Sequence, residues 1–70
     1  MDRASILTLL ARRPFEPLKI QLSGGESFEI RHPEVAALGK SGLVIVDPET
    51  DQLVICALLH ITSVRTSVAA

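Results

Sequence analysis

Two short apolar runs separated by a turn constrain this chain most strongly. Residues 43–46 read Leu-Val-Ile-Val and residues 52–56 read Gln-Leu-Val-Ile-Cys, with Asp-Pro-Glu-Thr-Asp between them. Aspartate and proline favour turns, and uninterrupted runs of β-forming apolar residues are typical of strands covered on both faces. We therefore predict a hairpin whose strands have no solvated face. A chain of 70 residues has little else with which to cover both sides.

Apolar and polar residues alternate in two earlier stretches, which are joined by Ser-Gly-Gly. This alternation predicts two strands with one dry face each. A three-residue loop pairs Ile20 with Phe28 and Leu18 with Ile30, whereas a two-residue loop sets Ile20 against Glu29. Because a one-residue slip turns a strand's apolar face toward water, the sequence predicts the three-residue loop.

A short helix is predicted at the N-terminus, over about residues 2–12. Asp2 is a suitable N-cap, and Pro14 moves the preceding residue out of the helical region. Arg12 and Arg13 suit the negative end of the helix dipole. We expect this helix to pack against one end of the core.

The remaining segments are predicted from the proline and glycine residues that interrupt regular secondary structure. Pro33 cannot donate to a strand ladder, and residues 34–38 fit a single helical turn closed by a glycine. The last strand ends at about residue 66, and residues 67–70 are expected to fray.

The predicted fold class is mainly β, with a short N-terminal helix followed by a five-stranded antiparallel small barrel of Sm or SH3 type over about residues 15–66. A flat five-stranded sheet with the helix across one face is the alternative. The whole chain, 1–70, is predicted to be a single domain. Both arrangements leave strand edges unpaired, and a single cysteine cannot form an internal disulfide. Self-association is therefore the expected additional source of stability.

Composition excludes several classes of protein. The apolar content of 47% and net charge of -1 exclude a disordered chain. The longest apolar run, residues 53–59, is too short to cross a bilayer, and no basic leader or small-residue cleavage site is visible. We expect a cytoplasmic protein without a membrane partner.

Candidate catalytic residues are few, because no nucleophile–base pair, paired carboxylates or glycine-rich phosphate motif is recognisable. His60 is flanked by leucine and isoleucine, so a structural or subunit-contact role is expected. His32 precedes Pro33 and is expected to start a helical turn. Cys56 has no cationic neighbour and is expected to be a buried small hydrophobe. The sequence predicts neither enzyme activity nor a metal or cofactor.

The element order resembles that of Sm-like proteins over residues 2–66, most closely the Hfq-like bacterial RNA chaperones. The resemblance rests on Leu-Ser-Gly-Gly at 22–25, Leu-Val-Ile at 53–55 and Ile-Thr-Ser-Val at 61–64. It implies a ring in which the fourth strand of one subunit pairs with the fifth of the next. The expected oligomer interface is then Leu53, Val54, Ile55, Cys56, Ile61 and Val64.

The chain departs from the Hfq-like pattern in its RNA-contacting residues. That family has a Lys-His pair before the last strand, whereas residues 58–60 here read Leu-Leu-His, and base-stacking aromatics are missing. Residues 13–17, 31–34 and 58–61 also resemble a group of short uncharacterised bacterial proteins.

Two functions follow as expectations. The first is a homo-oligomeric assembly or protein-interaction module with an unidentified protein partner. The alternative is an Sm-like ring that binds RNA through phosphate contacts, since a ring repeats each cation around its axis. The candidate RNA-binding residues are Arg12, Arg13, Arg31, Lys40 and Arg65.

Overall fold

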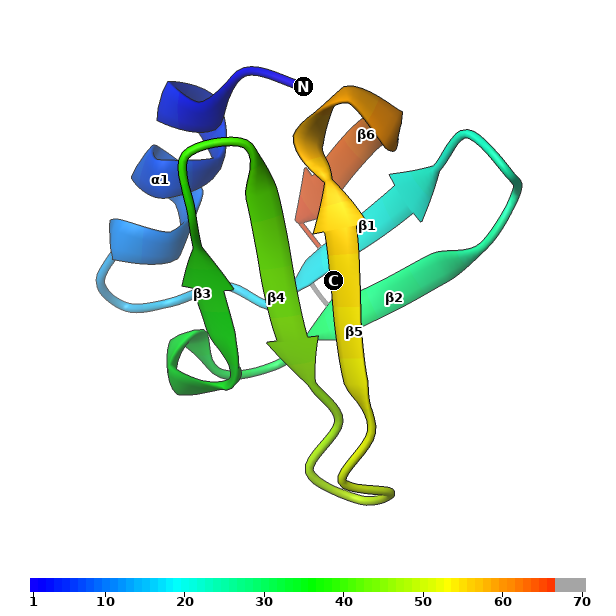
Figure 1. The fold of residues 1–70 in the computed structure, drawn as a ribbon. Helices are drawn as coiled ribbons and strands as arrows, with labels where there is room; N and C mark the ends of the chain where they lie inside the picture. The colour runs from blue at the N-terminus through cyan, green and yellow to red at the C-terminus, as the bar shows by residue number, and fades with distance from the viewer. Residues whose placement is uncertain (67–70) are drawn as a thin grey trace.

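Two three-stranded antiparallel sheets and one α-helix make up the fold in the computed structural model, which describes residues 1–66 (Figure 1). Sheet A has the order β2-β1-β6, and sheet B has the order β3-β4-β5. The expected fraying of 67–70 lies outside the described residues. The bounds are α1 Arg3–Ala11, β1 Leu18–Leu22, β2 Ser27–Ile30, η1 Pro33–Val35, β3 Ala36–Leu38, β4 Gly42–Val46, β5 Leu53–Ala57, η2 Leu58–His60 and β6 Ile61–Thr66.

The predicted five-stranded barrel is wrong, because the described residues form six strands in two separate sheets and no closed barrel. The single flat sheet is wrong for the same reason. The break falls between β2 and β3, where the 3-10 turn η1 begins at Pro33, a residue without a backbone donor. Strand β2 before this turn and strand β3 after it belong to different sheets.

The sixth strand arises from a segment predicted as helical. Residues 34–38 were expected to form one helical turn, but only Pro33–Val35 is helical and Ala36–Leu38 is β3. Strand β3 pairs with β4, with Ala36 opposite Ile45 and Leu38 opposite Leu43. Pairing with the apolar strand β4 therefore outweighs the helical preference of alanine and leucine in this segment.

The hairpin of β1 and β2 confirms the predicted register. Ile20 lies opposite Phe28 and Leu18 opposite Ile30. The Leu22 N–H donates to the Glu26 carbonyl over 2.8 Å, which closes a three-residue loop. Gly25 supplies the left-handed conformation that such a loop requires, with φ of 95°.

The N-terminal helix also follows its prediction. Asp2 is the N-cap, and its carboxylate accepts hydrogen bonds from the Ala4 N–H at 3.4 Å and the Ser5 hydroxyl at 3.2 Å. At the other end, the Arg13 guanidinium donates to the carbonyls of Leu10 at 3.0 Å and Arg12 at 2.7 Å. The arginine therefore satisfies carbonyls at the end of the helix directly.

One hydrophobic core joins α1 to both sheets. The helix contributes Ile6, which is fully buried, and the two sheets contribute mainly isoleucine and leucine from their facing sides. The core cluster is Ile6, Leu18, Ile20, Ile30, Leu43, Ile45, Leu58 and Ile61.

Candidate functional site

The outer face of sheet B carries only apolar side chains and glycine. Strand residues alternate between the two faces, and Leu43, Ile45 and Cys56 are buried on the core side. Their neighbours along each strand therefore point outward. In Figure 1 sheet B, coloured green to yellow, lies in front of sheet A, so its outer face is turned toward the viewer. This outer face consists of Ala37, Gly42, Val44, Val46, Leu53, Ile55 and Ala57.

Two large side chains stand out on this outer face. Leu53 is 62% exposed and Ile55 is 71% exposed. The register aligns Ala37, Val44 and Ile55 in one row across the three strands and places Val46 opposite Leu53. Such a continuous apolar row on a small protein is typical of a surface that another molecule covers.

Sheet A has a polar outer face and serves as an internal comparison. The register places Glu29, Lys19 and Arg65 in one row across β2, β1 and β6. The neighbouring row contains serine and glutamine, from Ser27 through Gln21 to Ser63. The same chain therefore places polar side chains on the outer face of sheet A and apolar side chains on the outer face of sheet B. The apolar face of sheet B is thus not a consequence of composition alone.

Strand β5 is also the end strand of sheet B. The Asp47 N–H donates to the Gln52 carbonyl at 2.9 Å, and the Leu58 N–H donates to the Ser41 carbonyl at 2.9 Å. Antiparallel pairs alternate between hydrogen-bonded and non-hydrogen-bonded, so the backbone groups of Val54 and Cys56 face β4. Those of Leu53, Ile55 and Ala57 face away from β4 and form an open edge, because no other strand of residues 1–66 pairs with β5.

The six predicted interface residues divide between the two sides of the strands. Only Leu53 and Ile55 point outward. Cys56 and Ile61 are buried, each 3% exposed, and Val54 and Val64 pack against the core. The expected interface did not include Val44 and Val46, although residues 43–46 were predicted to be apolar on both faces.

The five predicted RNA-binding cations do not form one patch. Arg31 is bonded to Glu29 at 2.6 Å, and Arg12 pairs with Glu16 at 3.4 Å. Lys40 lies near the start of α1, where the Arg3 side chain donates to the Gly39 carbonyl at 3.0 Å. Arg12 and Arg13 lie at the end of the same helix, about 13 Å away along its axis.

Arg65 has a cationic neighbour that the sequence reasoning missed. Lys19 lies directly opposite Arg65 in the register, and both side chains are exposed. The alternation of apolar and polar residues places Lys19 on the outward face of its strand, and this pattern could have identified it as a candidate. Glu29 is the third residue of this row, so the pair gives the row an excess of positive charge.

The two histidines occupy connections. The His60 carbonyl accepts the Ser23 N–H at 2.8 Å, and its ring Nδ1 lies 3.5 Å from the Ser23 hydroxyl, so His60 links η2 to the β1–β2 loop. His32 is the residue before η1, but its side chain makes no cap hydrogen bond and lies 4.0 Å from Glu34.

Cys56 is buried, and burial, followed by the charge of Glu26, raises the pKa of its thiol. A raised pKa disfavours the thiolate, which is the reactive form. Within residues 1–66, no three His, Cys, Asp or Glu side chains gather closely enough to hold a metal ion.

Neither protein-family models, curated proteins nor solved structures give a significant match to this chain. In the part of the chain that the structure describes, no helix combines the length and apolar character needed to cross a bilayer. The candidate functional site is therefore defined by the surface itself, the outer face of sheet B together with the open edge of β5.

Proposed function

We propose that this protein is a self-associating β module, in which a second copy covers the outer face of sheet B and the open edge of β5. The observation that carries the proposal is the exposure of Leu53 and Ile55 on an end strand whose outer face has no polar side chain. Burial of such side chains favours association, and an end strand offers backbone groups for pairing.

A second copy is favoured as the occupant because the same chain offers a complementary edge. Strand β6 is the end strand of sheet A, and its neighbour β1 uses the backbone groups of Lys19 and Gln21 to pair with Arg65 and Ser63. The groups of Val64 and Thr66 therefore face outward. Pairing of β5 in one copy with β6 in the next satisfies both edges, as the Sm-like resemblance implies.

Sedimentation velocity over a concentration series tests the proposal. We expect a mass that is an integer multiple of the chain mass at micromolar concentration, with a melting temperature that rises with concentration. A monomer whose melting temperature is independent of concentration would contradict self-association.

RNA binding is a second candidate, and the pairing of Lys19 with Arg65 favours it. Like charges directly opposite in a sheet are destabilising, and a bound phosphate would offset that repulsion. We expect a uridine-rich oligonucleotide to bind with an affinity that falls steeply with salt, and the double change Lys19→Gln with Arg65→Gln to weaken it more than Arg12→Gln with Arg13→Gln. Equal effects of the two double variants would eliminate this site.

A further inference from the structure

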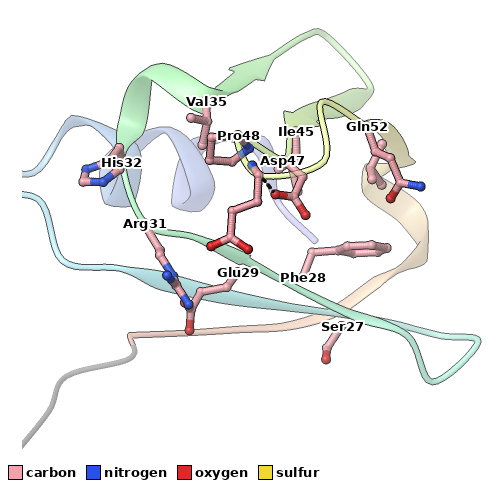
Figure 2. A pocket seen from close by; sticks show the side chains of 12 residues that line it. Ser27, Phe28, Glu29, Arg31, His32, Val35, Ile45, Asp47, Pro48 and Gln52 are labelled. Carbon is pink, nitrogen blue, oxygen red and sulfur yellow. Dashed lines mark hydrogen bonds and ion pairs between the residues drawn. The ribbon is translucent and has the colours of Figure 1, made fainter.

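A cleft of about 370 Å³ lies between β2 and the β4–β5 hairpin (Figure 2). Its apolar lining comes from Phe28, Val35, Ile45 and Val54. Ile45 and Val54 point to the core side of sheet B, so the cleft lies on the opposite side of that sheet from the outer face described above. Its volume falls within the range of ligand sites in proteins, roughly 300–1,000 Å³.

One wall of the cleft is the outer edge of β2, with which no strand of residues 1–66 pairs. Strand β2 is the end strand of sheet A. The Leu22 N–H bonds to the Glu26 carbonyl, so the alternating pattern places the backbone groups of Phe28 and Ile30 toward β1. The N–H and carbonyl groups of Ser27 and Glu29 face away from β1, and both residues line the cleft.

The polar lining carries an excess of negative charge. Glu29, Asp47 and Glu49 contribute three carboxylates, against the single guanidinium of Arg31. Arg31 is bonded to Glu29 at 2.6 Å. Asp47 accepts the Glu49 backbone N–H at 2.9 Å, which holds the loop beside the cleft. Figure 2 shows Arg31 and Glu29 at one end of the cleft and Gln52 at the other.

The charges of all three carboxylates influence Arg31. The pKa of Arg31 is raised by its hydrogen bond to Glu29 and by the charges of Glu29, Glu49 and Asp47. Glu29 is paired with Arg31, and the carboxylates of Asp47 and Glu49 form no ion pair among residues 1–66. The cleft therefore combines an apolar floor, an open β edge and a local charge that attracts cations.

We propose that this cleft binds an extended peptide segment of a partner protein, one that carries apolar side chains next to lysine or arginine. The segment adds a strand to the open edge of β2, so its backbone pairs with Ser27 and Glu29. Its apolar side chains cover Phe28 and Val54, and its cation lies beside Glu49 and Asp47. The same carboxylates repel nucleic acid, which favours a protein as the partner.

The direct test uses synthetic peptides and the full-length protein. The probe is a labelled Lys-Val-Thr-Val-Lys-Val peptide, compared with the same peptide carrying glutamate in place of lysine and with one N-methylated at alternate residues. We expect saturable binding of the basic peptide and weaker binding of both others. In ¹⁵N spectra, the largest amide shifts should fall on Ser27, Glu29 and Glu49.

Two variants of the β4–β5 loop give a matched pair. Glu49→Gln removes a carboxylate from the cleft and should weaken binding about two- to fivefold, as expected for an exposed ion pair. Asp51→Asn removes a carboxylate from the same loop but outside the cleft lining, and asparagine tolerates the φ of 58° found at Asp51. This variant should bind the peptide nearly as well as the unchanged protein.

Three results would overturn the proposal: equal binding of the acidic peptide, equal loss in both variants, or amide shifts centred on Leu53 and Ile55 instead of β2. Sedimentation of the same samples separates this proposal from self-association. A monomer that binds the peptide contradicts only self-association, and an oligomer that does not bind it contradicts only the peptide site.

Discussion

Replacement of Ile55 by threonine should weaken self-association without unfolding the chain. Ile55 is 71% exposed in the isolated chain, and complete burial of an isoleucine side chain is worth about 1.5–3 kcal/mol. Covering its exposed part therefore contributes about 1–2 kcal/mol per buried copy. An interface that buries one Ile55 should lose about 6- to 30-fold in affinity, and a two-fold symmetric interface should lose the square of that factor.

Threonine keeps the β-branched shape, so the strand itself should be little affected. Substitutions at exposed positions usually change stability by less than about 0.5 kcal/mol. The matched control is Leu7→Gln, which replaces a 45% exposed leucine that lies on α1 and not on the outer face of sheet B. Sedimentation velocity should show a shift toward smaller species for Ile55→Thr at a given concentration and no shift for Leu7→Gln.

The neighbouring residue gives a sharper contrast. Cys56 is 3% exposed on the core side of sheet B and Ile55 points outward, so Cys56→Lys should unfold the chain while Ile55→Lys should dissociate it and keep the fold. Circular dichroism distinguishes the two outcomes. The reasoning would be refuted by an Ile55→Thr variant that associates as tightly as the unchanged protein, or by a Leu7→Gln variant that dissociates equally.

Two further predictions concern stability. Gly25→Ala should cost about 1 kcal/mol, or about 4–8 °C in Tm, because φ of 95° disfavours a side chain even though an added Cβ meets no atom within 4 Å. Gly24→Ala should cost less, since its Cβ meets only the movable Glu26 side chain, and thermal melts compare the two. The raised pKa of Cys56 contributes stability that is fully present below the ordinary thiol pKa of 9.0 and is lost as pH rises above it. Between pH 8 and pH 10, the urea midpoint of unfolding should therefore fall more for the unchanged protein than for Cys56→Val. Equal falls in the two proteins would contradict a contribution from Cys56.

The parts of the fold that sequence predicted are those set by local pattern. The β1–β2 register follows from matching Ile20 with Phe28, because any slip exposes an apolar face. The apolar character of both faces of β4 and β5 follows from the absence of polar alternation in residues 43–46 and 53–56. These properties depend on side-chain type and spacing, which the sequence states directly.

The parts that sequence missed depend on contacts between distant segments. Ala36–Leu38 is a strand because β4 lies beside it, and its own residues favour a helix. The division into two sheets depends on the direction that the chain takes after β2, at the turn that begins at Pro33, and no periodicity encodes that direction. Phe28 was assigned to the core and Asp47 and Glu49 to a turn, and only the tertiary fold brings all three to one cleft.

The outer face of sheet B and the cleft lie on opposite sides of that sheet, so a molecule bound to the outer face does not cover the cleft. In these proposals, outward residues such as Ile55 would form the contact between copies, while inward residues such as Val54 line the cleft. An assembly would then carry as many clefts as it has subunits. A partner with several basic, apolar segments would bind such an assembly far more tightly than a single subunit, because each further contact forms at high effective concentration. Weak binding by one cleft is therefore compatible with tight binding by the assembly. Dissociation of the assembly by Ile55→Lys should abolish the gain in affinity for the partner with several segments. The same variant should leave the affinity for a single short peptide unchanged.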